Sequence, residues 1–276
     1  MSNARHHAVA ALFVAVVLLP ALISGAREPQ RSAVQNPVSS GRPSPSTTDD
    51  LSNREFTFVR LRYDSPHSPY NYSYGGAWRV DFPEADQHFV KGIREWAGTN
   101  LRVSSTAIQL RATDERIFQY PLVYIVEPGH MELTEEEAAS LREYLRRGGF
   151  LFLDDFHGER EWRRAQEQLR MVLPEYKIND LPLSHPIFHS YFDLDAVVQV
   201  PGVAALVNGV TYERSDSVTP HYMGIQNDNG RLMVFMTRNC DLGDAWEWIN
   251  DRRYPALYGV MAYKIGMNVV IYAMSH

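Results

Sequence analysis

Acidic, amide and imidazole side chains follow four apolar runs of this 276-residue chain, at the point where each run ends. The side chains concerned are Asp64, Glu127, His130, Asp154, Asp155, His157, Asn239 and Asp241. If the runs are parallel strands of one sheet, these groups meet at one edge. Carboxylates that meet there repel one another, so the pKa of at least one should rise unless a cation lies between them. Such a set suits general acid–base chemistry or a hard divalent cation with oxygen ligands.

The elements that must position these groups are clearest in residues 120–158, which have the pattern of strand, helix and strand. Leu122–Val126 and Phe150–Leu153 are short apolar runs, typical of strands buried on both faces. Between them, Thr134 and Glu137 have the spacing of a capping box at a helix start. Two parallel strands joined by a helix form a right-handed unit, and ligands of such sheets bind beyond the carboxyl ends of the strands.

The same reading predicts the rest of the architecture. Strands are expected at 56–63, 101–104, 108–110 and 231–237 and as short pieces within 197–210, and helices at 86–98, 159–173, 243–250 and 254–266. Residues 181–194 are expected to be irregular, and 268–274 fit either a helix end or a terminal strand. The pattern indicates an α/β protein with a flavodoxin-like three-layer fold and a mainly parallel sheet.

Residues 65–83 are rich in Tyr, Ser, Gly and Pro and too long for a simple connection. Loops of this length in compact domains are commonly functional or mobile. Tyr72 and Trp78 in this segment could line a pocket or stack on a flat ligand, and the alternative is a packed surface loop.

The N-terminus has the composition of an export signal. An apolar run over 8–23 follows a weakly basic start, and small residues end at Ala26, so residues 1–26 are predicted to be a signal peptide. The alternative is an uncleaved inner-membrane anchor. Residues 27–54 are rich in Pro, Ser and Thr and are predicted to be a disordered linker before an α/β domain at 55–276. The protein is therefore expected to be periplasmic or extracellular.

Several function classes find no support. The net charge of −6 gives no electrostatic case for binding nucleic acid or an anionic membrane surface, so any membrane contact would come from the N-terminal segment. The single cysteine, Cys240, has no basic partner in the sequence and is not assigned as a nucleophile. Pro186 argues against His185 and His189 sharing a helix face, zinc spacings such as HExxH are absent, and no residue is assigned as a metal ligand. No cofactor is implied.

The motifs resemble those of the DUF4159 family of bacterial exported or membrane-tethered proteins. The matching pieces are 58–63, 120–129, 133–155, 181–188, 239–247 and 266–274. The resemblance implies a class I glutamine amidotransferase-like fold and no settled activity. The segment at 185–188 also resembles a segment of the ThuA-like relatives. The amidotransferase nucleophile would follow a central strand, and here Asp154 and Asp155 stand there instead of a cysteine, so glutamine hydrolysis is not expected.

The sequence therefore favours an exported α/β domain that binds a small polar ligand or a partner protein at the carboxyl edge of its sheet. The candidate ligand-binding residues are Asp64, Tyr72, Trp78, Glu127, Asp154, Asp155, His157, Asn239, Asp241 and Asp244, with Trp246 and Glu247 in support. Asp154 or Asp155 could instead cap the helix that begins near Glu159. Two other classes stay open: a hydrolase or carbohydrate-active enzyme that uses paired carboxylates with or without a divalent metal, and a structural module of an envelope protein complex.

Overall fold

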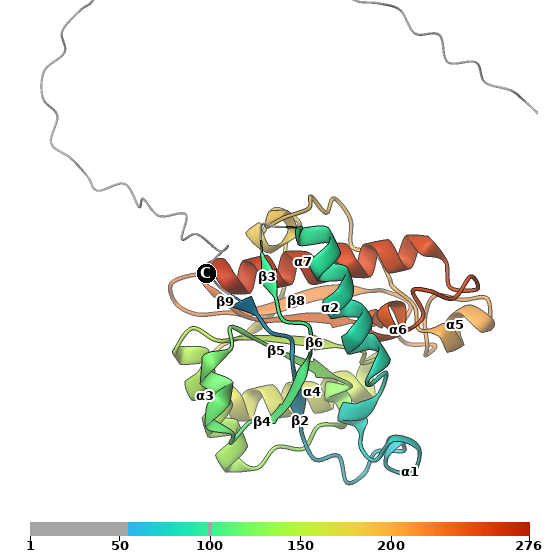
Figure 1. Ribbon diagram of the computed structural model, residues 1–276. Coiled ribbons are helices and arrows are strands. Elements are labelled where there is room, and N and C mark those ends of the chain that lie inside the picture. The colour runs from blue at the N-terminus through green and yellow to red at the C-terminus, as the bar shows by residue number, and fades with distance from the viewer. Residues whose placement is uncertain (1–54, 99–100) are drawn as a thin grey trace, which may run out of the picture. The chain divides into compact units, whose positions relative to one another are not determined.

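A seven-stranded sheet organises residues 55–98 and 101–276, the part of the chain that this computed structural model describes (Figure 1). Its strands, in spatial order, are β4 (Ile108–Arg111), β2 (Val59–Arg62), β5 (Leu122–Val126), β6 (Phe150–Asp154), β9 (Leu232–Arg238), β8 (His221–Gln226) and β7 (Ile178–Asp180). The first five pair in parallel, and β8 runs antiparallel to both of its neighbours. The predicted signal peptide and linker lie outside the described residues.

Helices cover both faces of the sheet. The longer helices are α2 (Glu84–Ala97), α3 (Glu135–Arg146), α4 (Gly158–Val172) and α7 (Ala256–Ser275), and the shorter ones are α1 (Tyr70–Tyr74), α5 (Val203–Val207) and α6 (Leu242–Glu247). Leu122, Tyr124 and Val126 of β5 pack with α2, α6 and α7, whereas Val123 and Ile125 pack with α3 and α4. Because successive strand residues face opposite sides, both faces are apolar and both are covered. The result is a three-layer α/β fold consistent with a flavodoxin-like layout.

The predicted capping box at the start of α3 is confirmed. The Thr134 hydroxyl accepts a hydrogen bond from the Glu137 N–H at 3.1 Å, and the Glu137 carboxylate accepts one from the Thr134 N–H at 3.0 Å. Both bonds satisfy backbone donors that a helix start otherwise leaves free. The unit β5–α3–β6 is therefore formed as its sequence predicts.

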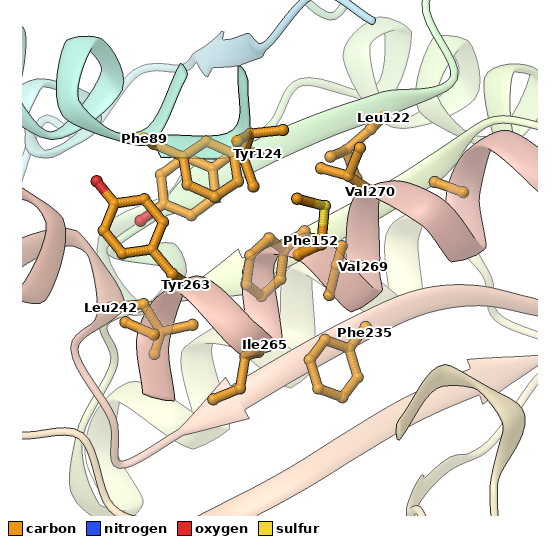
Figure 2. Packing of buried hydrophobic residues seen from close by; sticks show 14 of the residues in the cluster. Phe89, Leu122, Tyr124, Phe152, Phe235, Leu242, Tyr263, Ile265, Val269 and Val270 are labelled. Atoms are coloured by element: carbon orange, nitrogen blue, oxygen red, sulfur yellow. The ribbon is translucent and has the colours of Figure 1, made fainter. Parts of the chain in front are cut away.

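Residues 256–275 form one continuous helix, α7, after a short turn, which decides between the two alternatives for 268–274 in favour of the helix. Figure 2 shows Ile265, Val269 and Val270 of α7 packed against Phe152 and Phe235 of the sheet. Among the described residues, α7 is the one helix long and apolar enough to cross a membrane, but 67% of its apolar window is buried inside the domain. That burial is typical of a core helix.

One prediction about the second half of the chain was wrong, and two strands there were not predicted. The short strands expected within 197–210 are absent there, and Gly202 instead begins helix α5, whose Val203 N–H donates to the Asp244 carboxylate at 2.7 Å. A contact with a distant acid thus overrides the β-branched residues of this segment. Strands β7 and β8 were missed because they lack a continuous apolar run.

The first half of the domain also departs from the predicted pattern. The strand expected at 56–63 is divided into β1 (Glu55–Phe56) and β2, and β1 pairs with β3 (Arg102–Val103) outside the main sheet. The segment 65–83, expected to be a loop, contains α1 and a short 3-10 turn, η2 (Ala77–Arg79). The remaining 3-10 turns are η3 (Glu115–Gln119), η4 (Pro128–His130) and η5 (Pro186–His189).

Candidate functional site

Three neighbouring strands place the residues that follow them at one edge of the sheet. Glu127 follows β5, Asp155 follows β6 and Asn239 follows β9. With Asp81, they are the four non-glycine residues of positive φ in the described part of the chain, with φ between 50° and 62°. A left-handed backbone is uncommon for such residues and gathers where function or tight packing demands it. Here all four surround the same edge.

At the centre of this edge, Asp81, Asp155 and Asp241 are buried, and each offers a carboxylate oxygen within 4.8 Å of the other two. Burial raises the pKa of each well above its ordinary value, and the nearby charges of Asp244, Glu127 and Asp155 raise them further. Asp81 is only 8% exposed, and its Oδ2 has no hydrogen-bond partner among the residues that the structure describes. A buried polar atom without a partner is unusual and needs an explanation.

Three further carboxylates extend this group, and the six together are called the carboxylate cluster: Asp81, Asp155, Glu213, Asp241, Asp244 and Glu247. Burial, followed by the charge of Asp244, raises the pKa of both Glu213 and Glu247 to about 7. The Glu213 side chain is 27% exposed and lies at the rim of the cluster. The cluster is thus a concentrated set of carboxylates, and burial raises the pKa of Asp81, Asp155, Glu213, Asp241 and Glu247.

Two glycines allow the carboxylates to approach. A Cβ at Gly243 would lie 2.2 Å from Oδ2 of Asp81. A Cβ at Gly202 would lie 2.2 Å from Oε1 of Glu213 and 2.7 Å from Oδ2 of Asp241. Any larger side chain at either position would therefore displace an oxygen of the cluster.

Asp81 is positioned by a buried arginine rather than by a strand. The Arg60 guanidinium donates to the backbone carbonyls of Trp78 at 3.2 Å and Val80 at 3.0 Å, and its Nε donates to Asp86 at 2.9 Å. Arg60 and Asp86 are both buried. This pair ties the segment before Asp81 to the first turn of α2, so Asp81 reaches the edge through a tertiary contact.

Beside the cluster lies a second group made of Glu127, His130 and Glu161. Nε2 of His130 is 3.8 Å from Glu127 and 3.6 Å from Glu161. Burial and the charge of Glu161 raise the pKa of Glu127 well above its ordinary value. Burial would also raise the pKa of Glu161, but His130, the His157 N–H and Arg214 lower it to about 2. The pKa values of the two glutamates are therefore displaced in opposite directions.

His157 joins the two groups. Its Nε2 lies 3.1 Å from Oδ1 of Asp155 and 3.7 Å from Oε1 of Glu213, and its Nδ1 has no partner. Burial and the charge of Arg214 lower the pKa of His157 to about 4, against the opposing charge of Glu161. The imidazole is therefore neutral at pH 7 and can act as a nitrogen ligand or a proton acceptor.

Asp154 stabilises the start of helix α6 and is not part of the carboxylate cluster, although it directly precedes Asp155 in the sequence. Its two carboxylate oxygens accept four hydrogen bonds, from the Tyr124 hydroxyl, the Thr237 hydroxyl and the N–H groups of Leu242 and Gly243. The alternative that Asp154 or Asp155 caps the helix near Glu159 was wrong. Asp154 accepts from the start of α6, and the first N–H groups of α4 find other acceptors.

One of the acceptors at the start of α4 is Asn239, which was also predicted as a site residue. Oδ1 of Asn239 accepts from the Gly158 N–H at 3.0 Å, and the Asn239 amide donates to the Thr219 carbonyl at 2.7 Å. Asp241 has a double role, because its Oδ1 caps α6 through the Asp244 N–H at 2.7 Å while the side chain also belongs to the carboxylate cluster.

The three other predicted residues lie apart or cannot be placed. Asp64 is exposed and pairs with Arg111 at 2.7 Å, and it contacts none of the carboxylate cluster. Trp78 is half-buried, with the Arg62 guanidinium 5.0 Å from its ring centre. The backbone of Tyr72 lies in α1, and its side chain is outside the described part of the structure.

Asp81, Glu161 and Glu213 were not predicted as site residues. Asp81 lies in the segment 65–83, whose length gave a signal without indicating which residue mattered. Glu161 follows the run of acids and histidine after β6, at a spacing that a helix would fold back onto His157. Glu213 lies in an irregular stretch, where no local pattern distinguishes it.

The fold and this edge define a three-layer α/β domain with a buried, carboxylate-rich site at the carboxyl ends of its strands. The chain belongs to the family described as domain of unknown function DUF4159, whose family model matches residues 57–274. No curated protein matches the sequence.

Proposed function

We propose that this domain binds a hard divalent cation through the carboxylate cluster, with Asp81, Asp155 and Asp241 as the central ligands. The observation that carries the proposal is the unpartnered Oδ2 of Asp81, which is buried beside two further carboxylates. The sequence predicted a small polar ligand at this edge, and the proposal specifies that the ligand is a cation. It leaves the amidotransferase-like and ThuA-like relationship as a prediction.

The spacing of the oxygens suits one ion. Ca²⁺ binds oxygen at about 2.3–2.6 Å and Mg²⁺ at about 2.0–2.1 Å, so two oxygens on one ion are at most roughly 5 Å apart. The oxygens of Asp81, Asp155 and Asp241 all lie within 4.8 Å of one another. Carboxylate ligands favour Mg²⁺, Ca²⁺ or Mn²⁺ over soft metals.

The protein supplies little positive charge of its own to these three acids, because the Arg60 guanidinium lowers the pKa of Asp81 only in part against burial and the charge of Asp244. No arginine or lysine of the described residues forms an ion pair with them, because Arg60 is paired with Asp86 and Arg214 with Glu161. A buried carboxylate must be neutralised by a proton, a partner or a metal. Since the pKa of each acid is raised, these carboxylates bind protons more readily than exposed ones do, and a cation must compete with those protons.

The test is to titrate Ca²⁺, Mg²⁺ and Mn²⁺ separately into the chelator-treated full-length chain, by calorimetry and by thermal unfolding. We expect at least one ion to bind with a millimolar or tighter Kd and to raise the Tm, because a ligand at about 100 times its Kd stabilises by about 2.7 kcal/mol. Asp155→Asn should weaken binding by more than about 100-fold, beyond the usual cost of altering an outer-shell group.

The matched control is Asp228→Asn, an exposed aspartate in the turn between β8 and β9. It should bind the ion as the wild type does. Without metal, Asp155→Asn should be at least as stable as the wild type, because it removes a repelled charge from the cluster. If none of the three ions binds, or if Asp155→Asn binds as Asp228→Asn does, the proposal fails.

Metal-assisted hydrolysis is a second candidate, motivated by Glu127 and Glu161. Their pKa values are displaced in opposite directions, which is the arrangement of an acid and base pair. Metal-loaded protein would be assayed against chromogenic phosphate, ester and glycoside substrates. We expect Glu127→Gln to abolish turnover while it leaves cation binding within about threefold of the wild type. Absence of turnover on all three classes would count against this candidate.

A further inference from the structure

A basic pocket lies next to the acidic site. It has a volume of about 600 Å³ and lies between the segment 66–71, residues 129–130 of η4, and the first turns of α4. His67, His130, Arg160 and Arg164 line it, and no Asp or Glu does. Its charge is therefore opposite to that of the carboxylate cluster.

The two arginines share one face of α4 because they are one helical turn apart. Within the described part of the chain, Arg160 forms one ion pair, with Glu161 at 3.6 Å, and that carboxylate is also held by Arg214 and His130. Arg164 forms no ion pair with any described residue. Because a guanidinium carries five N–H donors, both side chains retain donors for a ligand.

The first two N–H groups of α4 already have acceptors within the protein. The Glu159 N–H donates to Asp216 at 3.0 Å, and the Gly158 N–H donates to Asn239. The charged donors that line the pocket are therefore the guanidinium groups of Arg160 and Arg164, beside the imidazoles of His67 and His130. Paired guanidinium groups recognise the planar or tetrahedral oxygens of carboxylate and phosphate.

We propose that this pocket binds the oxyanion group, phosphate or carboxylate, of a small ligand whose remainder reaches the carboxylate cluster. The inference deepens the proposed cation site and rests on it. His130 is the link, because it lines the pocket and contacts both Glu127 and Glu161, and Glu161 accepts from the His157 N–H at 2.7 Å. The His157 ring in turn contacts Asp155. A bound cation and an adjacent anion pocket would together hold an anionic ligand at two points.

The test uses inorganic phosphate and acetate as probes, titrated into the full-length chain with Mg²⁺ present and at ionic strength held constant with chloride. Arg164→Gln is the test variant, and Arg163→Gln is its matched control, since Arg163 is exposed on α4 and does not line the pocket. We expect Arg164→Gln to weaken phosphate or acetate binding about 10-fold or more. Arg163→Gln should leave it within about twofold of the wild type. Preference for phosphate over acetate, or the reverse, identifies the oxyanion.

Mg²⁺ binding is measured on the same three proteins. It should be equal in all of them, because neither arginine belongs to the carboxylate cluster. If Mg²⁺ binds and neither probe does, or if the two variants behave alike, the anion pocket is refuted and the cation site stands. If neither Ca²⁺, Mg²⁺ nor Mn²⁺ binds, the proposed function itself is refuted.

Discussion

Acidic side chains at the carboxyl edge of the sheet lie in two opposite environments, one exposed and one buried. Beyond β2 and β4, Asp64 is exposed, and Arg111 holds it at 2.7 Å while also lying 3.3 Å from Glu137. The hydrogen bond from Arg111 lowers the pKa of Asp64. Beyond β6 and β9, Asp155 and Asp241 are buried without such a partner, and their pKa values are raised.

The difference shows which acids the protein neutralises by itself. An exposed carboxylate with an arginine beside it has its counter-charge built in and needs no ligand. A buried carboxylate that stays ionised without a partner costs several kcal/mol, and domains retain such groups mainly where a proton or a metal completes them. The outer part of the edge is therefore a structural contact, and the central part is the proposed binding site.

The largest effect on stability is expected from a substitution of Asp154. In the central part of the edge, Asp154 is a structural residue, whereas its neighbour Asp155 belongs to the proposed binding site. Asp154→Ala removes the acceptor of two α6 backbone donors and of two hydroxyls. We expect a loss of about 2–4 kcal/mol in the free energy of unfolding, because capping and buried hydrogen bonds are lost together. Urea denaturation of Asp154→Ala beside metal-free Asp155→Asn measures this. A loss below about 0.5 kcal/mol for Asp154→Ala would contradict the assignment.

A smaller effect on stability is expected from a change of pH. The folded pKa values of Glu213 and Glu247 are raised to about 7, above their ordinary 4.5, so the folded metal-free protein binds more protons than the unfolded chain between these values. The lowered pKa of His157 acts in the opposite direction over this interval, but two carboxyl groups outweigh one imidazole, so the stability should rise as the pH falls from about 7 to about 4.5. Saturating cation should flatten this dependence, because ligated carboxylates stay ionised. Thermal unfolding at a series of pH values measures both, and a metal-free Tm that falls over this interval would contradict the assignment.

The sequence predicted the parts of the fold and site that depend on neighbouring strands. Apolar runs followed by acids were enough to expect Glu127, Asp155 and Asp241 at one edge, and the structure brings them there. Asp81 could not be predicted in the same way. It reaches the edge because Arg60, far away in the sequence, binds the backbone before it, and such tertiary contacts leave no local periodicity.

The same limit explains why the sequence did not separate Asp64, which is exposed and paired with Arg111, from the buried acids of the edge. Its position after a strand resembled that of Asp155, but β2 lies toward the outer side of the sheet, with only β4 beyond it. Parallel strands fix a common edge, but the strand order decides which ends are covered by other elements and which face solvent. That order involves crossovers, so it was not readable from the pattern of runs.

The smallest effect on stability is expected from Asp64→Asn, which tests whether the outer part of the edge is only a structural contact. The pair with Arg111 is exposed, and such pairs contribute about 0.2–1 kcal/mol, less at high salt. Because the pKa of Asp64 is lowered, this contribution is present above its ordinary value of 3.8 and is lost as the pH falls through the folded pKa. Cation affinity should not change, since Asp64 contacts none of the carboxylate cluster. A loss of cation binding in Asp64→Asn, measured beside Asp228→Asn by calorimetry, would mean that the whole edge acts as one site and that the division drawn between its two parts is wrong.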